Sequence, residues 1–91
     1  MNYEPFLFKS YNRVIGTAHN LKELESEIKR LSIEDPACVE YHLKEGHIVQ
    51  WLSYIDETDL SKRLNGVSNP RKALHIIFKH DRRHSTEKTG I

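Results

Sequence analysis

Capping residues divide most of this chain into short segments, and this division limits what it can fold into. Asparagine or an aspartate–proline pair precedes three apolar patterns, at Asn20, Asp35-Pro36 and Asn69-Pro70. Asn and Asp side chains accept hydrogen bonds from the free amides of a helix's first turn, and proline fits that turn. Gly46 and Asn65-Gly66 stand where a left-handed residue ends a helix. The chain is therefore expected to form several short helices.

The apolar residues between these signals repeat at helical spacing, and Ala73, Leu74, Ile77 and Phe78 are expected to form the buried stripe of the last helix. A helix is expected from Asn20, where Asn20 and Glu23 would each accept from the other's amide in a capping box, and Ser32–Asp35 is the next boundary. Residues 36–44 fit either a strand or a helix, and their charged neighbours favour a helix. The four apolar patterns are Leu21, Leu24, Ile28 and Leu31; Ile48, Trp51, Leu52 and Ile55; Leu60 and Leu64; and Ala73, Leu74, Ile77 and Phe78.

The N-terminal part of the chain has the composition of a β-hairpin. Residues 5–9 are aromatic and apolar, residues 10–13 are typical of a turn, and residues 14–18 predict a return strand in which Gly16 marks a bulge or an end. The expected fold class is α+β, with an N-terminal β-hairpin or ribbon packed on four to five short α-helices. We expect residues 1–79 to form a single compact domain and residues 80–91 to form a flexible C-terminal tail.

Length and composition limit the class of protein. A chain of 91 residues with 37% hydrophobic residues builds only a thin core, which favours a partner chain, such as a second copy in a homodimer. The net charge of +1 gives no global electrostatic case for nucleic acid or membrane. The single cysteine excludes an internal disulfide. Without a signal-like start or a long apolar run, the protein is expected to be cytoplasmic, with no membrane contact.

Two histidines and the cysteine raise the question of a metal site. Cys38 and His42 stand one helical turn apart, and His47 follows five residues later. Zinc sites usually show several cysteines or recognisable paired spacings, and five residues on one unbroken helix would put His42 and His47 about 140° apart. We therefore expect His42 to be half-buried and to donate to a carbonyl, and His47 to cap its helix or face solvent. No metal or cofactor is predicted, although the sequence leaves open whether the three side chains converge.

Catalysis has little support in the sequence. Trp51 stands at core spacing between Ile48 and Ile55, so its ring is expected in the core rather than at a ligand. The four glycines are isolated and form no phosphate-binding loop, and nothing near Cys38 marks an oxyanion hole. The protein is therefore predicted not to be an enzyme.

A basic region near the C-terminus favours nucleic acid as an alternative partner. Residues 62–84 hold seven Lys or Arg against one Asp, and such a cluster can neutralise phosphates. The two helices predicted there resemble a helix-turn-helix loosely, because the first is too short and the connection too long. Bases at a helix C-terminus also match the helix dipole. The candidate contacts are Lys62, Arg63, Arg71, Lys72, Lys79, Arg82 and Arg83.

Several short motifs between residues 6 and 64 resemble a family of small archaeal and bacterial domains of unknown function. An apolar N-terminal strand is followed by a Leu-Lys-Glu-Leu helix start, a Tyr-His pair and a His-Ile-x-x-Trp-Leu pattern. The family often has alanine where this chain has Ser61, so the last match is loose. The resemblance implies a similar small fold and no particular activity. The matching residues are Phe6-Leu7-Phe8, Leu21-Lys22-Glu23-Leu24, Tyr41-His42, His47-Ile48, Trp51-Leu52, Tyr54-Ile55, Asp56 and Leu60.

These observations predict a small non-enzymatic binding or regulatory module that acts through protein–protein contacts. His42, His47 and Trp51 are its candidate interaction site, and a free edge of the ribbon could extend a partner's sheet. The partner is an unidentified protein or a second copy of the chain. The alternative is a weak nucleic-acid-binding protein that uses the basic C-terminal helix and tail.

Overall fold

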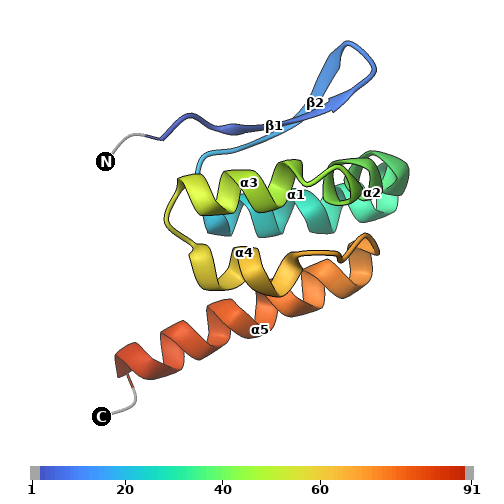
Figure 1. Ribbon diagram of the computed structural model, residues 1–91. Helices are drawn as coiled ribbons and strands as arrows, with labels where there is room; N and C mark the ends of the chain where they lie inside the picture. Colours follow the sequence, from blue (N-terminus) through green and yellow to red (C-terminus); the bar gives the residue numbers. More distant parts are fainter. Residues whose placement is uncertain (1–2, 90–91) are drawn as a thin grey trace.

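A β-hairpin followed by five helices makes up the chain, so the predicted α+β class is confirmed (Figure 1). The computed structural model describes residues 3–89, with side chains to residue 82. The hairpin lies along one side of α1, α2 and α3, and α4 and α5 lie on the other side. The elements are β1 (Phe6–Ser10), β2 (Arg13–Ala18), α1 (Leu21–Glu34), α2 (Pro36–Lys44), α3 (His47–Tyr54), α4 (Thr58–Leu64) and α5 (Pro70–Thr89).

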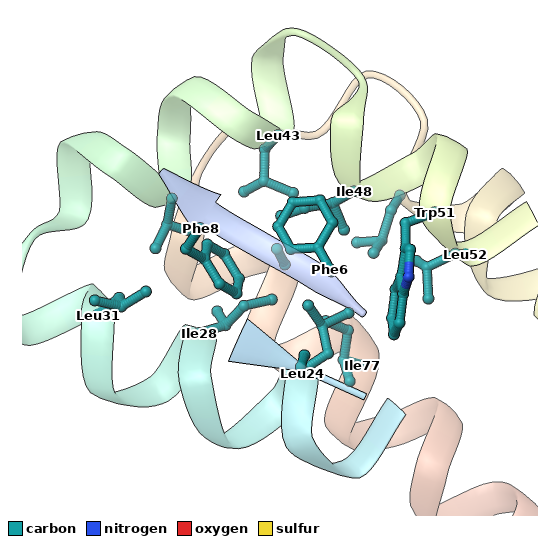
Figure 2. Close-up of a cluster of buried hydrophobic side chains, with 14 of the residues drawn as sticks. Phe6, Phe8, Leu24, Ile28, Leu31, Leu43, Ile48, Trp51, Leu52 and Ile77 are labelled. Carbon is teal, nitrogen blue, oxygen red and sulfur yellow. The ribbon is translucent and has the colours of Figure 1, made fainter. Parts of the chain in front are cut away.

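The core fills the space between the hairpin and the helices. Phe6 and Phe8 point from β1 toward apolar side chains of α1, α2 and α3, and Ile77 reaches the same cluster from α5 (Figure 2). Trp51 is only 7% exposed, which confirms the prediction that its ring belongs to the core. The other buried apolar residues are Ala18, Leu24, Ile28, Leu31, Cys38, Val39, Leu43, Ile48, Leu52, Leu60, Leu64 and Ala73.

The buried face of α5 differs from the predicted one. Ala73 and Ile77 are buried as expected, but Phe78 is 45% exposed, so its assignment to the core was wrong. His80 is buried instead, at the spacing that continues the stripe from Ala73 and Ile77. Successive residues of an α-helix are rotated by about 100° around the helix axis, so Phe78 points away from the stripe that contains its neighbour Ile77.

Most helix boundaries follow the predicted caps. The side chains of Asn20, Asp35 and Asn69 accept from amides in the first turns of α1, α2 and α5. Gly46 and Gly66 adopt positive φ angles of 80° and 84°, as a left-handed helix end requires. Residues 36–44 are helical, which decides the ambiguity in favour of a helix.

The beginning of α1 corrects one detail of the sequence prediction, and its end confirms the predicted boundary. The carboxylate of Glu23 accepts from the amide of His19 at 2.8 Å rather than from Asn20, so the expected capping box is displaced by one residue. α1 ends at Glu34 with Asp35 as its C-cap, which lies within the boundary expected in Ser32–Asp35. The hydroxyl of Ser32 donates to the carbonyl of Ile28 within the helix, and only Asp35 ends it.

The predicted tail begins inside a helix. α5 continues to Thr89, through most of the range 80–91 that was expected to be a flexible tail, and residues 90–91 lie outside the described residues. The domain boundary expected after residue 79 precedes His80, which packs in the core. The flexibility of the remaining tail stays a prediction.

Side chains from the helices bind both outer edges of the hairpin. On β2, the amide of Thr17 donates to Glu27 at 3.2 Å, and the guanidinium of Arg30 donates to the carbonyl of Ile15 at 2.7 Å. Ile15 forms a bulge beside Gly16, as predicted. A β-carbon at Gly16 would stand 2.7 Å from the Glu27 carboxylate, so glycine permits this approach of β2 to α1.

The outer edge of β1 is held at two points. At its beginning, the indole N–H of Trp51 donates to the carbonyl of Glu4 at 2.8 Å, and the amide of Glu4 donates to the Tyr54 hydroxyl at 2.8 Å. At its end, the ring of His42 lies against the backbone of Lys9. Strand addition would have to displace these bonds, which makes the ribbon edges a poorer contact surface than the sequence suggested.

Candidate functional site

A recess lies where the hairpin turn meets the beginning of α2 and of α3. Its volume is about 640 Å³, which falls within the usual range for ligand pockets. The hairpin, the junction of α1 with α2, and the first residue of α3 all contribute to it. We call it the histidine recess, and its lining residues are Lys9, Ser10, Tyr11, Asp35, Ala37, Cys38, Tyr41, His42 and His47.

The two candidate histidines meet in this recess. The Nδ1 atoms of His42 and His47 are 3.0 Å apart, a hydrogen-bond distance. Gly46, with its left-handed backbone, turns the chain between α2 and α3 and so brings the two rings together. Spacing on one continuous helix would have separated the two rings, so their contact depends on this break.

His42 also binds the strand beside it. Its Nε2 atom is 3.1 Å from both the amide nitrogen and the carbonyl oxygen of Lys9. The bond to the carbonyl is the one that the sequence predicted, and the short distance to the amide was not foreseen. His42 is 5% exposed and packs edge-on against Phe6 and Phe8 on one side and Tyr41 on the other.

The contacts of His42 couple the tautomers of the two rings. When Nε2 of His42 carries its proton, it donates to the Lys9 carbonyl and leaves Nδ1 to accept from His47. When Nδ1 carries the proton, it donates to His47 and leaves Nε2 to accept from the Lys9 amide. A hydrogen bond at the far nitrogen of His47 therefore determines which backbone group His42 binds.

The surroundings of His42 favour its neutral form. Burial lowers the pKa of His42, and the neighbouring His47 lowers it further, while the hydrogen bond with the Lys9 backbone acts in the opposite direction. The lowered pKa favours the neutral form of His42, in which one ring nitrogen donates and the other accepts.

Cys38 lines the same recess but does not join the histidines in a metal-binding arrangement. Its thiol lies 3.6 Å from the Lys9 carbonyl, which is also within hydrogen-bond distance of Nε2 of His42. His42 contacts His47 through its other ring nitrogen, Nδ1. Among residues 3–82, no three His, Cys, Asp or Glu side chains are grouped to hold a metal ion. Burial, together with the charge of Asp35, raises the pKa of the thiol, which disfavours the thiolate form.

Two tyrosines at the rim were not predicted as site residues. Tyr11 is 99% exposed at the tip of the hairpin, with a positive φ of 58°, and Tyr41 is 54% exposed beside both imidazoles. Tyr41 precedes His42 on α2, and its side chain is largely exposed. No feature of the local sequence shows that the hairpin tip approaches α2.

Trp51 is separate from the recess. Its indole is buried beside the beginning of β1 (Figure 2), and Trp51 is not among the residues that line the recess. The structure therefore brings together two members of the predicted constellation, His42 and His47, and assigns the third to packing.

Four of the seven predicted nucleic-acid contacts share one exposed face of α5. A rotation of about 100° per residue places six exposed residues within an arc of about 120° on this helix. This basic face has no acidic residue, and the guanidinium of Arg82 lies 5.4 Å above the ring of Phe78. Its members are Arg71, Lys72, His75, Phe78, Lys79 and Arg82.

The remaining three predicted nucleic-acid contacts do not belong to this basic face. Lys62 and Arg63 are exposed in the last turn of α4, which packs against α5. Arg83 belongs to α5, but its side chain lies outside the described ones. The predicted cluster is therefore a four-residue stripe on α5 with a pair on the adjacent helix.

A comparison with protein families, curated proteins and solved structures found no match for this chain. The resemblance to a family of small prokaryotic domains stays a prediction. Within residues 3–89, none of the helices combines the length and the apolar character needed to cross a membrane.

Proposed function

We propose that this protein is a small non-enzymatic binding module that takes a segment of a partner protein into the histidine recess. The observation that carries the proposal is the combination of a recess of about 640 Å³ with exposed Tyr11 and Tyr41 at its rim and the His42–His47 pair at its base. Tyrosine is frequent in binding surfaces, because it contributes a large rigid contact area at low entropic cost.

The backbone at Tyr11 supports this proposal. A two-residue hairpin connection favours glycine or asparagine at positive φ, and a tyrosine there holds its backbone in an unfavourable region. Its side chain is 99% exposed, so packing within the domain does not compensate for this unfavourable backbone conformation. A contact with a partner would explain a tyrosine at this position.

The proposal includes a cytoplasmic location and no catalytic role. The buried thiol of Cys38 is suited to a compartment where thiols stay reduced, and its raised pKa disfavours a nucleophilic function. A second copy of the chain remains among the candidate partners.

Site-specific photo-crosslinking tests the proposal directly. A benzoylphenylalanine residue replaces Tyr11 in one variant and the exposed Phe78 of the basic face in another, and both are irradiated in native host cells. We expect the probe at Tyr11 to form a discrete protein adduct, which disappears when Tyr41→Ala and His47→Ala are added. An adduct that persists in the Tyr41→Ala, His47→Ala background, or none at Tyr11, would contradict the recess as the binding site.

Nucleic acid is the second candidate partner, and the continuous basic face of α5 favours it. Four cations and an exposed aromatic ring on one helical face can neutralise phosphates and stack on bases. Titration of labelled duplex and single-stranded DNA and RNA at low and high salt tests this candidate.

The triple variant Arg71→Ala, Lys72→Ala, Lys79→Ala should reduce the slope of log affinity against log salt by about three, roughly one for each phosphate that the variant no longer neutralises. The variant Lys22→Ala, Lys29→Ala, Lys44→Ala is the matched control, because it removes the same charge from exposed positions on α1 and α2. The absence of binding at low salt, or an equal decrease of slope in the control, would exclude the basic face.

A further inference from the structure

The side chains that line the histidine recess include several groups able to donate hydrogen bonds and one carboxylate. Hydroxyl, thiol, ammonium and imidazole groups that can donate come from every element that lines it. Its only carboxylate, on Asp35, already accepts from the amide of Cys38 at 3.2 Å as the cap of α2. A ligand that supplies hydrogen-bond acceptors would therefore complement this lining.

Counting protons on the histidine pair makes the ligand chemistry more specific. The neutral pair has two N–H groups among four ring nitrogens, and both tautomeric arrangements use His42 to bind Lys9 and His47. One additional proton gives three N–H groups. The first donates to the Lys9 carbonyl and the second joins the two Nδ1 atoms, which leaves the third on Nε2 of His47.

The Nε2 atom of His47 has no hydrogen-bond partner among the described side chains, and it is not among the buried polar atoms. His47 is half-buried and lines the recess, so a ligand in the recess can reach this ring. A second additional proton would place two N–H donors against each other at 3.0 Å, so the pair is suited to take up one proton and not two.

We infer that the histidine recess binds a carboxylate through Nε2 of His47, and that the His42–His47 pair takes up one proton when it does so. The inference rests on the proposed function, because it names the group of the partner that enters the recess. An imidazolium–carboxylate bond is a charge-assisted hydrogen bond, roughly twice as strong as a neutral one. The carboxylate belongs to an acidic side chain or to a chain end of the partner.

The other charged and titratable groups that line the recess come from β1, the hairpin turn, the junction of α1 with α2, and α2. Lys9 on β1 carries a positive charge, Asp35 at the junction of α1 and α2 carries a negative one, and Tyr11, Cys38 and Tyr41 complete the set. Histidine is the side chain whose charge ordinarily changes between pH 5 and 8, so proton uptake in this range is assigned to the pair.

Three capped peptides test the inference by nuclear magnetic resonance titration at pH 6, 7 and 8. The first is acetyl-Ala-Ala-Phe with a free carboxylate, the second has the same sequence with a terminal amide, and the third is acetyl-Ala-Glu-Phe-amide. We expect at least one carboxylate peptide to bind about tenfold more tightly than the Ala-Ala-Phe amide at pH 6. Its affinity should fall by up to about tenfold for each pH unit up to pH 8. Whichever carboxylate peptide binds identifies the source.

Nitrogen-15 labelling of histidine provides a second readout. On binding, the His42 signal should report a proton on Nε2, and the His47 signal should report protons on both nitrogens. His47→Gln should remove the pH dependence while the protein stays folded. His19→Gln is the matched control at an exposed histidine outside the recess and outside the basic face, and it should leave binding unchanged.

Equal binding of the carboxylate and amide peptides, affinity independent of pH, or unchanged pH dependence in His47→Gln would overturn the inference. So would the absence of any carboxylate-dependent shift at the two histidines. These outcomes are separate from those of the crosslinking experiment. A protein adduct at Tyr11 combined with no carboxylate preference would leave the proposed function standing and remove only the ligand chemistry.

Discussion

The two ends of β1 are held by nitrogen heterocycles of neighbouring helices, and the two contacts differ in kind. At the beginning of the strand, Trp51 from α3 donates to the carbonyl of Glu4. At its end, His42 from α2 lies equally close to the amide and the carbonyl of Lys9. Indole can only donate, whereas imidazole can donate or accept. The strand thus has one fixed and one adjustable attachment, and the adjustable one borders the recess.

The largest predicted effect comes from the fixed end. Trp51→Ala should lower the free energy of unfolding by about 3–5 kcal/mol, because it leaves a cavity and removes the bond to Glu4. Chemical denaturation followed by circular dichroism measures this decrease. Trp51→Phe is the control that keeps an aromatic ring and removes the donor, so its cost should be smaller. A decrease below about 1 kcal/mol for Trp51→Ala would show that the indole is not part of the core.

His42→Leu should cost less, about 1–3 kcal/mol at pH 7. It keeps an apolar side chain among Phe6, Phe8 and Tyr41, but it deprives Lys9 and His47 of their shared partner. Denaturation measured in parallel with the Trp51 variants tests the comparison between the two ends. A cost equal to that of Trp51→Ala would mean that the two attachments contribute equally to stability.

The same His42 variant should change how stability depends on pH. Burial holds the pKa of His42 in the folded protein below its ordinary value, so the unfolded chain takes up a proton first as the pH falls below about 6.5. The His42 contribution to stability is therefore present above that pH and is lost as the pH falls through the folded pKa, at no more than about 1.4 kcal/mol per unit.

Denaturation at intervals between pH 7.5 and 5 should show a smaller decrease for His42→Leu than for the wild type. Trp51→Phe should retain the wild-type dependence, since it removes no titratable group. If the His42 variant and the wild type lose stability in parallel, the ring titrates no differently in the folded and unfolded states.

The sequence predicted local structure better than it predicted the site. Asn20, Asp35 and Gly46 act through neighbouring backbone groups, so their roles follow from short-range rules that hold in most folds. The recess depends on the path of the whole chain, because Tyr11 and Tyr41 approach only when the hairpin lies across α2. Phe78 was assigned to the core because it stands one turn after Leu74, but the buried stripe of α5 continues from Ile77 to His80.

The opposite edge of the hairpin gives a prediction of similar or smaller size. Gly16→Ala should destabilise the protein by about 1–2 kcal/mol, because its methyl group would displace the Glu27 carboxylate from Thr17. Hydrogen bonds from Arg30 and Thr17 hold the pKa of Glu27 below its usual range, so displacing this carboxylate breaks favourable bonds.

Adding Glu27→Ala to Gly16→Ala separates the two causes. If the methyl group acts by displacing the Glu27 carboxylate, the double variant should be destabilised by less than the sum of the two single variants. In that case Glu27→Ala removes the carboxylate with which the methyl group would clash. Strictly additive effects would indicate that the methyl group is instead opposed by Leu31, the next nearest contact.

The smallest expected effect, and the only stabilising one, is at the hairpin tip beside the adjustable end. Tyr11→Gly should raise the free energy of unfolding by about 0.5 kcal/mol, because relief of the left-handed backbone outweighs the greater freedom of glycine in the unfolded chain. The fully exposed ring contributes little packing to offset this gain. Under the proposed function the same variant loses partner binding, so stability and binding should change in opposite directions. Tyr11→Asn, which also tolerates positive φ, is the matched control, and it should reproduce both changes. A clear decrease of stability in both variants would instead assign Tyr11 a role within the fold, and the exposed tyrosine would no longer support a binding surface at the recess.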